Sequence, residues 1–186
     1  MSSVRSVITW QFRPGSELRI TRYPNLTAPQ FYGCVAAFVD SLSGELNAAA
    51  GALRRLEGRT KGAAFAYEME LDLHRYGALI VLDRWSSLVQ AFGPHLDLPR
   101  NRGIVERAAE RVGAAQEVLT RANEVVDAAE RYSTEVVEAC LVAWQSLNAT
   151  FQEERAETGE WAKLGPMLPD EYREARRIFL EDLAAR

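Results

Sequence analysis

The 186-residue sequence has few of the residues on which metal and redox chemistry depend. It contains two histidines, His74 and His95, and two cysteines, Cys34 and Cys140. Both cysteines fall on apolar helical stripes, where a free cysteine behaves as a small buried hydrophobic residue, so no disulfide framework is expected. We therefore expect no bound metal and no cofactor.

The sequence also lacks a hydrophobic run long enough to cross a membrane. Its longest clean aliphatic run covers residues 78–82, whereas a transmembrane helix needs about 20 consecutive apolar residues. Residues 1–5 are not followed by the apolar segment of a secretory signal. We expect a cytoplasmic protein without a membrane partner.

Lysine is nearly absent, because the 22 basic residues are 20 arginines together with Lys61 and Lys163. With abundant alanine, this composition is typical of GC-rich coding and favours a bacterial source. Arginine clusters therefore carry little functional information. The net charge of −4 argues against a general nucleic-acid binder, since such proteins use positive charge to bind phosphates.

Glycine and proline are both missing from residues 114–158, a stretch of 45 residues. Apolar or small residues recur in this stretch and just before it as two heptad rows: Val105, Val112, Leu119, Val126, Ser133, Cys140, Leu147, and Ala108, Ala115, Ala122, Ala129, Val136, Ala143, Thr150. The pattern predicts one very long helix over about residues 101–157, roughly 80 Å in length. Gradual drift of the apolar stripe favours packing in a bundle over an isolated coiled-coil dimer. If the helix is not continuous, Ser133 and Thr134 are the expected kink.

Shorter elements are predicted on both sides of this helix. Alternating apolar residues around a Pro14-Gly15 turn predict a β-hairpin over residues 4–24. A capping box at Thr27 and an apolar stripe predict a helix over residues 27–57, which Gly58 ends. A last amphipathic helix is expected over residues 170–185.

The pattern of residues 60–92 predicts a helix whose middle is apolar nearly all round. One side carries Phe65, Met69, Leu73, Tyr76 and Ile80, and another carries Leu71, Ala78, Leu82 and Val89. Such a helix should occupy the centre of the fold. We therefore predict a single all-α domain over residues 1–186, a helical bundle with one very long helix and a short N-terminal β-hairpin.

Glu70 and His74 lie one turn apart in the segment 60–92, a spacing that can present two ligands to one metal ion. The paired Glu-x-x-His motifs of di-iron bundles are absent, and His95 falls in an expected loop. The nearby Asp72 and Arg75 form a simpler intrahelical ion pair. We interpret this region as a polar stripe, and keep a helical enzyme or a small-molecule or metal binder as the alternative.

The expected hairpin is basic and aromatic. It combines one glutamate with interleaved arginines and aromatic residues: Glu17, Arg5, Arg13, Arg19, Arg22, Trp10, Phe12 and Tyr23. Such interleaving can neutralise phosphates and stack bases. Because arginine is abundant throughout the chain, we interpret the aromatics as packing against the bundle, and a regulatory protein that contacts nucleic acid through the hairpin is a third hypothesis.

A helix of roughly 80 Å exceeds its expected neighbours, at roughly 45 and 50 Å. Part of its apolar stripe should therefore be exposed unless another helix, another chain or a kink covers it. Trp144, Phe151 and Trp161 lie where cover would be needed, and large aromatic side chains often anchor interfaces. We expect a non-catalytic interaction or assembly subunit that binds a second copy or a protein partner through residues 140–161.

Overall fold

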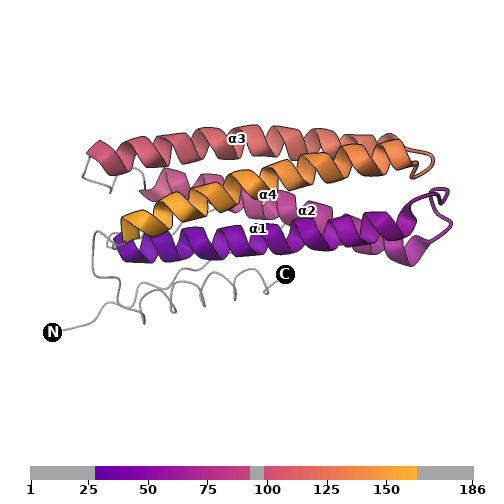
Figure 1. The fold of residues 1–186 in the computed structure, drawn as a ribbon, viewed down its shortest axis with the longest axis horizontal. Coiled ribbons are helices and arrows are strands. Elements are labelled where there is room, and N and C mark those ends of the chain that lie inside the picture. Colours follow the sequence, from indigo (N-terminus) through magenta and orange to yellow (C-terminus); the bar gives the residue numbers. More distant parts are fainter. Residues whose placement is uncertain (1–27, 93–98, 163–186) are drawn as a thin grey trace.

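The computed structural model describes residues 28–92 and 99–162, which form four helices (Figure 1). Their bounds are Ala28–Leu56 for α1, Phe65–Phe92 for α2, Pro99–Ala128 for α3 and Thr134–Ala162 for α4. Thr60 and Arg131 form an isolated β-bridge between two loops, and these two described stretches contain no β-strand. None of the described helices is long and apolar enough to span a membrane.

The four helices surround one core in chain order. Each helix packs against the next, and α4 closes the ring by packing against α1 (Figure 1). Among the described residues, the diagonal pairs α1 with α3 and α2 with α4 make no close backbone contact. This is the up-down-up-down arrangement of a four-helix bundle.

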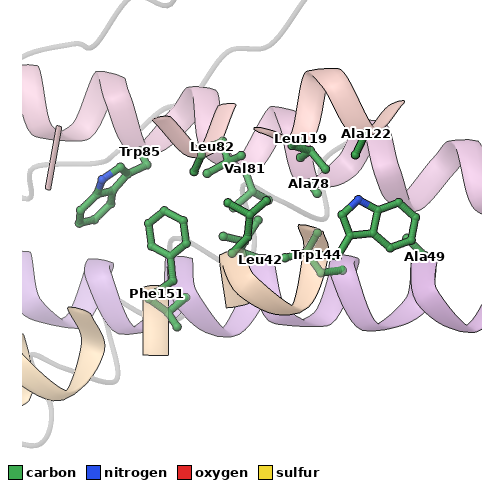
Figure 2. Close-up of a cluster of buried hydrophobic side chains, with 14 of the residues drawn as sticks. Leu42, Ala49, Ala78, Val81, Leu82, Trp85, Leu119, Ala122, Trp144 and Phe151 are labelled. Atoms are coloured by element: carbon green, nitrogen blue, oxygen red, sulfur yellow. The ribbon is translucent and has the colours of Figure 1, made fainter. Parts of the chain in front are cut away.

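The core is built from one inward-facing row on each helix. In α1, apolar residues recur at three- and four-residue spacing and are fully buried, among them Val35, Phe38, Leu42, Ala49 and Leu53. Aromatic rings fill the half of the bundle away from the α1–α2 loop. Phe38 stacks on Trp85 with ring centroids 4.6 Å apart and meets Phe151 edge to face at 5.3 Å. Figure 2 shows Trp85 and Phe151 in this part of the core. Such aromatic pairs stabilise beyond their buried area.

The prediction of one helix over residues 101–157 is wrong. The chain reverses direction at residues 129–133, and α3 and α4 pack side by side as a hairpin (Figure 1). In this arrangement the apolar rows of both helices face the same core, whereas a straight helix of that length would leave much of its row in water. Ser133 acts as the N-cap of α4, because its Oγ accepts a hydrogen bond from the Val136 N–H at 3.4 Å.

Two loops meet at one end of the bundle and fix the position of the α3–α4 turn. The Gly58 N–H donates to the Tyr132 carbonyl at 2.7 Å, and the Tyr132 N–H donates to the Arg59 carbonyl at 3.1 Å. The Lys61 N–H donates to the Glu130 carbonyl at 2.9 Å. Gly58 has a φ of +79°, which a side-chain-bearing residue rarely adopts, so glycine suits the end of α1.

The helices expected over residues 27–57 and 60–92 correspond to α1 and α2. The second begins later than predicted, at Phe65, because Gly62 adopts a φ of +82° in the preceding loop. The hairpin expected over residues 4–24 and the helix expected over residues 170–185 lie outside the described residues.

Candidate functional site

The side of α2 that points away from the core carries a row of exposed apolar residues. Phe65, Met69 and Leu73 are 69%, 57% and 66% exposed, and Tyr76 is 46% exposed. Ile80 continues the row and is partly buried. We call these five residues the α2 outer face. Single exposed apolar residues are common, but a contiguous row of this kind is typical of an interaction site.

The spacing of the α2 outer face suits another helix. Met69, Leu73, Tyr76 and Ile80 follow one another at intervals of four, three and four residues, which is the seam pattern of a coiled coil. On the opposite side of α2, a second row packs in the bundle core: Leu71, Ala78, Leu82, Trp85 and Val89. Thus α2 carries two seams, and within the described residues only one of them is covered.

Polar side chains border the α2 outer face on both edges. On the α1 side, Arg55 pairs with Glu70 and lies over the Tyr67 ring, with its guanidinium carbon 5.5 Å from the ring centroid. On the α3 side, the Arg75 Nε donates to Asp72 at 2.9 Å. An apolar centre with a polar rim is the usual anatomy of a protein-protein interface.

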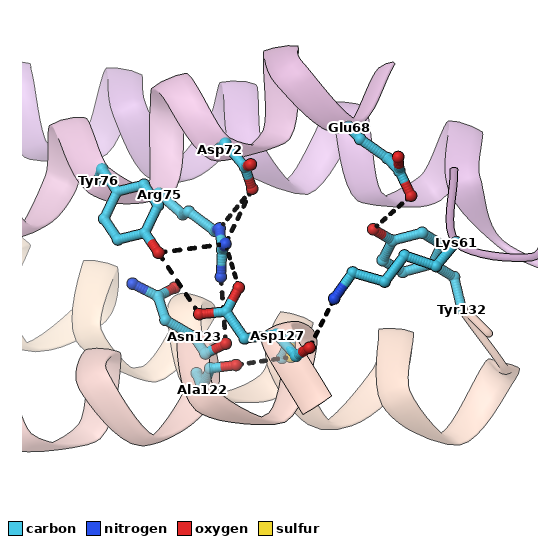
Figure 3. A network of polar contacts seen from close by, with 10 residues as sticks. Lys61, Glu68, Asp72, Arg75, Tyr76, Ala122, Asn123, Asp127 and Tyr132 are labelled. Carbon is cyan, nitrogen blue, oxygen red and sulfur yellow. Dashed lines mark hydrogen bonds and ion pairs between the residues drawn. The ribbon is translucent and has the colours of Figure 1, made fainter. Parts of the chain in front are cut away.

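Arg75 is the most heavily bonded of these edge residues. It is 2% exposed, and its guanidinium reaches across to α3, where Nη1 donates to the Asn123 carbonyl at 3.1 Å and Nη2 pairs with Asp127 (Figure 3). The same group lies 4.6 Å from the centroid of the Tyr76 ring. A buried charge is tolerated only when it is paired in this way.

Electrostatics keep Arg75 ionised. Burial opposes its positive charge, but the hydrogen bond to Asp127 and the carboxylates of Asp72 and Asp127 outweigh that penalty and raise the pKa of Arg75. Arg75 is therefore a permanent cation that ties α2 to α3. With its donors engaged by these groups, we interpret it as structural support for the α2 outer face.

Tyr132 lies at the end of the bundle where the α1–α2 and α3–α4 loops meet. It is 2% exposed, and its hydroxyl donates to Glu68 of α2 at 3.2 Å (Figure 3). Burial, reinforced by the negative charge of Glu68, raises the pKa of Tyr132 to about 12. The phenol thus stays neutral at any physiological pH and binds the α3–α4 turn to α2.

We expect Tyr132 to make the fold sensitive to alkali. Tyrosine ionises near pH 10 in the unfolded chain and near pH 12 in the folded one, so its contribution is complete below pH 10 and is lost as the pH rises through 12. The loss should reach about 2 to 3 kcal/mol of unfolding free energy. Urea denaturation from pH 8 to 12 should show that Tyr132→Phe removes this part of the alkaline decline. Equal declines in both proteins would contradict the assignment.

Glu70 and His74 do not converge on a common site. The His74 Nδ1 lies 2.9 Å from Glu45 Oε2 of α1, while Glu70 turns to Arg55. The described residues contain no group of three histidine, cysteine, aspartate or glutamate side chains arranged to hold a metal ion. Both side chains join α2 to α1, and His95 lies outside the described residues.

Cys140 has the environment of a core residue. Its Sγ lies 3.6 Å from the Ala122 carbonyl oxygen, and burial raises the pKa of its thiol. A protonated, buried thiol is a poor nucleophile and a poor metal ligand. The side chain of Cys34 is outside the described set.

The aromatic residues expected to anchor an interface lie on α4 and do not belong to the α2 outer face. Trp144 is 2% and Phe151 is 1% exposed, and both lie in the core cluster (Figure 2). The fold-back of α4 on α1 and α3 covers them. Trp161 is in the last turn of α4, but its side chain lies outside the described residues. A role for these three residues in binding a partner is untested.

The α2 outer face is the feature that sequence reasoning misplaced. The sequence predicts a central helix for its residues, because α2 is apolar on two sides. A signal was present, because the two rows differ: the buried row includes the small Ala78, which allows close helix approach, whereas the exposed row has no small residue.

No protein-family model, curated protein sequence or solved structure matches the chain.

Proposed function

We propose that this chain is a non-catalytic assembly subunit that self-associates by pairing its α2 outer face with that of a second copy. The observation that carries the proposal is the exposed apolar row of Phe65, Met69, Leu73 and Tyr76. In water such a row is unfavourable, and covering it is the main driving force for association.

The charges beside the row are compatible with an identical partner. In an antiparallel pair of α2 helices, Met69 can face Ile80 of the second copy while Leu73 faces its Tyr76. In that register Asp72 falls opposite a glycine and Glu70 opposite a leucine, Gly77 and Leu79 of the second copy. No like charges meet, and a two-fold axis relates the two copies as in most homodimers.

The size of the row predicts weak association. Its exposed side chains present on the order of 400 Å² of apolar surface, within the range of functional patches. A standard interface buries about 800 Å² on each partner. We therefore expect a dimer with a dissociation constant in the micromolar range.

Leu73→Glu should weaken self-association by about 10- to 100-fold, because it places a charge in the centre of the α2 outer face. Val142→Glu is the matched control, since Val142 on α4 is 65% exposed against 66% for Leu73. Sedimentation velocity at a few hundred micromolar compares the two variants with the parent chain. If both variants associate equally well, α2 is not the interface.

The alternative functions have less support. A metal or small-molecule site at Glu70 and His74 would need both side chains free to meet, yet each is engaged with α1. Contact with nucleic acid through residues 4–24 concerns a segment outside the described residues.

A further inference from the structure

The apolar row of α3 stays in heptad register with that of α4 across the turn that joins them. The buried residues Leu119 and Val126 of α3 and Cys140 and Leu147 of α4 are separated by 7, 14 and 7 residues. A hairpin turn imposes no such register, because each helix could bury any face. A continuous helix through residues 129–133 would therefore keep both apolar rows on one side.

The sequence of the turn is also compatible with a helix. Residues 129–133 contain no glycine or proline, and in the described part of the chain only Gly58 and Gly62 have positive φ. The turn thus uses no backbone conformation that is closed to ordinary residues. Ala129, Glu130 and Arg131 are strong helix formers.

The closed turn is held mainly by the neighbouring α1–α2 loop. The Arg131 guanidinium donates to the Gly58 carbonyl from Nε at 3.2 Å and from Nη2 at 3.0 Å. Thr134 donates to Glu57 at 3.1 Å, and both of these contacts are solvent-exposed. A continuous helix would exchange them, and the cap at Ser133, for its own backbone hydrogen bonds. It would also give up the backbone hydrogen bonds of Tyr132 and Glu130 to the α1–α2 loop and the contact of Tyr132 with Glu68.

We infer that the α3–α4 hairpin can open into one helix, so that α4 of one copy packs into the groove between α1 and α3 of a second copy. The contacts that α4 makes beyond its first turn can re-form between the two chains, including the Arg111–Glu154 ion pair and the packing of Trp144. Only the turn changes, as in other domain-swapped dimers. This exchange does not use the α2 outer face, so either proposal can fail alone.

Spin-label distances in the dimer would distinguish the two forms of the hairpin. The Leu73→Glu chain, with Cys34→Ala and Cys140→Ala, is labelled at Arg121→Cys and Val142→Cys, both exposed positions. It is diluted with unlabelled Leu73→Glu chain, unfolded, refolded at several hundred micromolar, and separated by size. In the closed hairpin the labelled helices are neighbours about 10 Å apart, whereas 21 residues of continuous helix span about 32 Å. The inference expects the long distance in the dimer and the short one in the monomer.

Two hinge variants should shift the dimer yield in opposite directions. Thr134→Pro fits the closed hairpin, because proline is favoured in the first helical position after the Ser133 cap, but it breaks a continuous helix. Ser133→Ala removes the cap and favours the helix. We expect at least tenfold less refolded dimer with Thr134→Pro and several-fold more with Ser133→Ala.

Three results would overturn the inference. They are a dimer that keeps the short label distance, the absence of any dimer after refolding of Ser133→Ala, and a Thr134→Pro chain that folds by circular dichroism yet yields as much dimer as its parent. If Thr134→Pro does not fold, the label distance and the dimer yield of Ser133→Ala still decide whether the hairpin opens.

Discussion

Trp144→Ala should lower the free energy of unfolding by about 3–5 kcal/mol, the usual cost of truncating a fully buried aromatic side chain. Trp144 is 2% exposed and is one of the largest side chains in the core (Figure 2). The loss should be the same at every protein concentration, because the ring packs within a single chain. Urea denaturation at several protein concentrations measures it.

Val142→Ala is the control for this experiment. Val142 lies two residues from Trp144 and is 65% exposed, so its truncation should change the unfolding free energy by no more than about 0.5 kcal/mol. If Trp144→Ala instead leaves the stability unchanged and abolishes self-association, Trp144 is an interface anchor and the described packing of α4 is wrong.

Arg75→Ala should cost about 2–4 kcal/mol, because it removes a buried side chain and leaves the Asn123 carbonyl without its donor. Arg75→Met keeps most of the volume without the charge, so it should cost less than half as much. The freed carboxylates of Asp72 and Asp127 are about half exposed and can be hydrated. Thermal and urea unfolding compare the variants, with the 79% exposed side chain of Arg121 replaced by alanine as the neutral control. Equal losses for alanine and methionine would contradict this expectation, because they would show that the lost hydrogen bonds and ion pairs of Arg75, and not its lost volume, set the cost.

Local signals were sufficient to predict α1 and α2. The end of α1 follows from Gly58, whose positive φ ends the helix, and the periodicity of α1 identified its buried face. For the α3–α4 turn, the alternative of a break at Ser133 and Thr134 gave the correct start of α4. Nothing local requires that break, because residues 129–133 contain no glycine or proline. Its position is set by Tyr132 and Glu130, whose backbone groups bond to the α1–α2 loop about 70 residues away in sequence. Such long-range pairing leaves no local mark.

The candidate site was visible in the sequence only in part. Both apolar faces of α2 could be recognised, and the Asp72–Arg75 pair formed as expected, at 2.9 Å. Which face of α2 is buried depends on how many helices surround it. The structure has two helices, α3 and α4, where the sequence predicts one, so the surroundings of α2 differ from the expectation. The second partner of Arg75, Asp127, lies 52 residues further along the chain and could not be inferred from spacing.

Sedimentation equilibrium of the unmodified chain, from about one micromolar to several hundred micromolar, tests the proposed self-association most directly. The range brackets the micromolar dissociation constant expected for an interface of this size. The account predicts that the apparent mass rises from 20.8 kDa towards twice that value as the concentration increases. A mass that stays at 20.8 kDa over the whole range would contradict it.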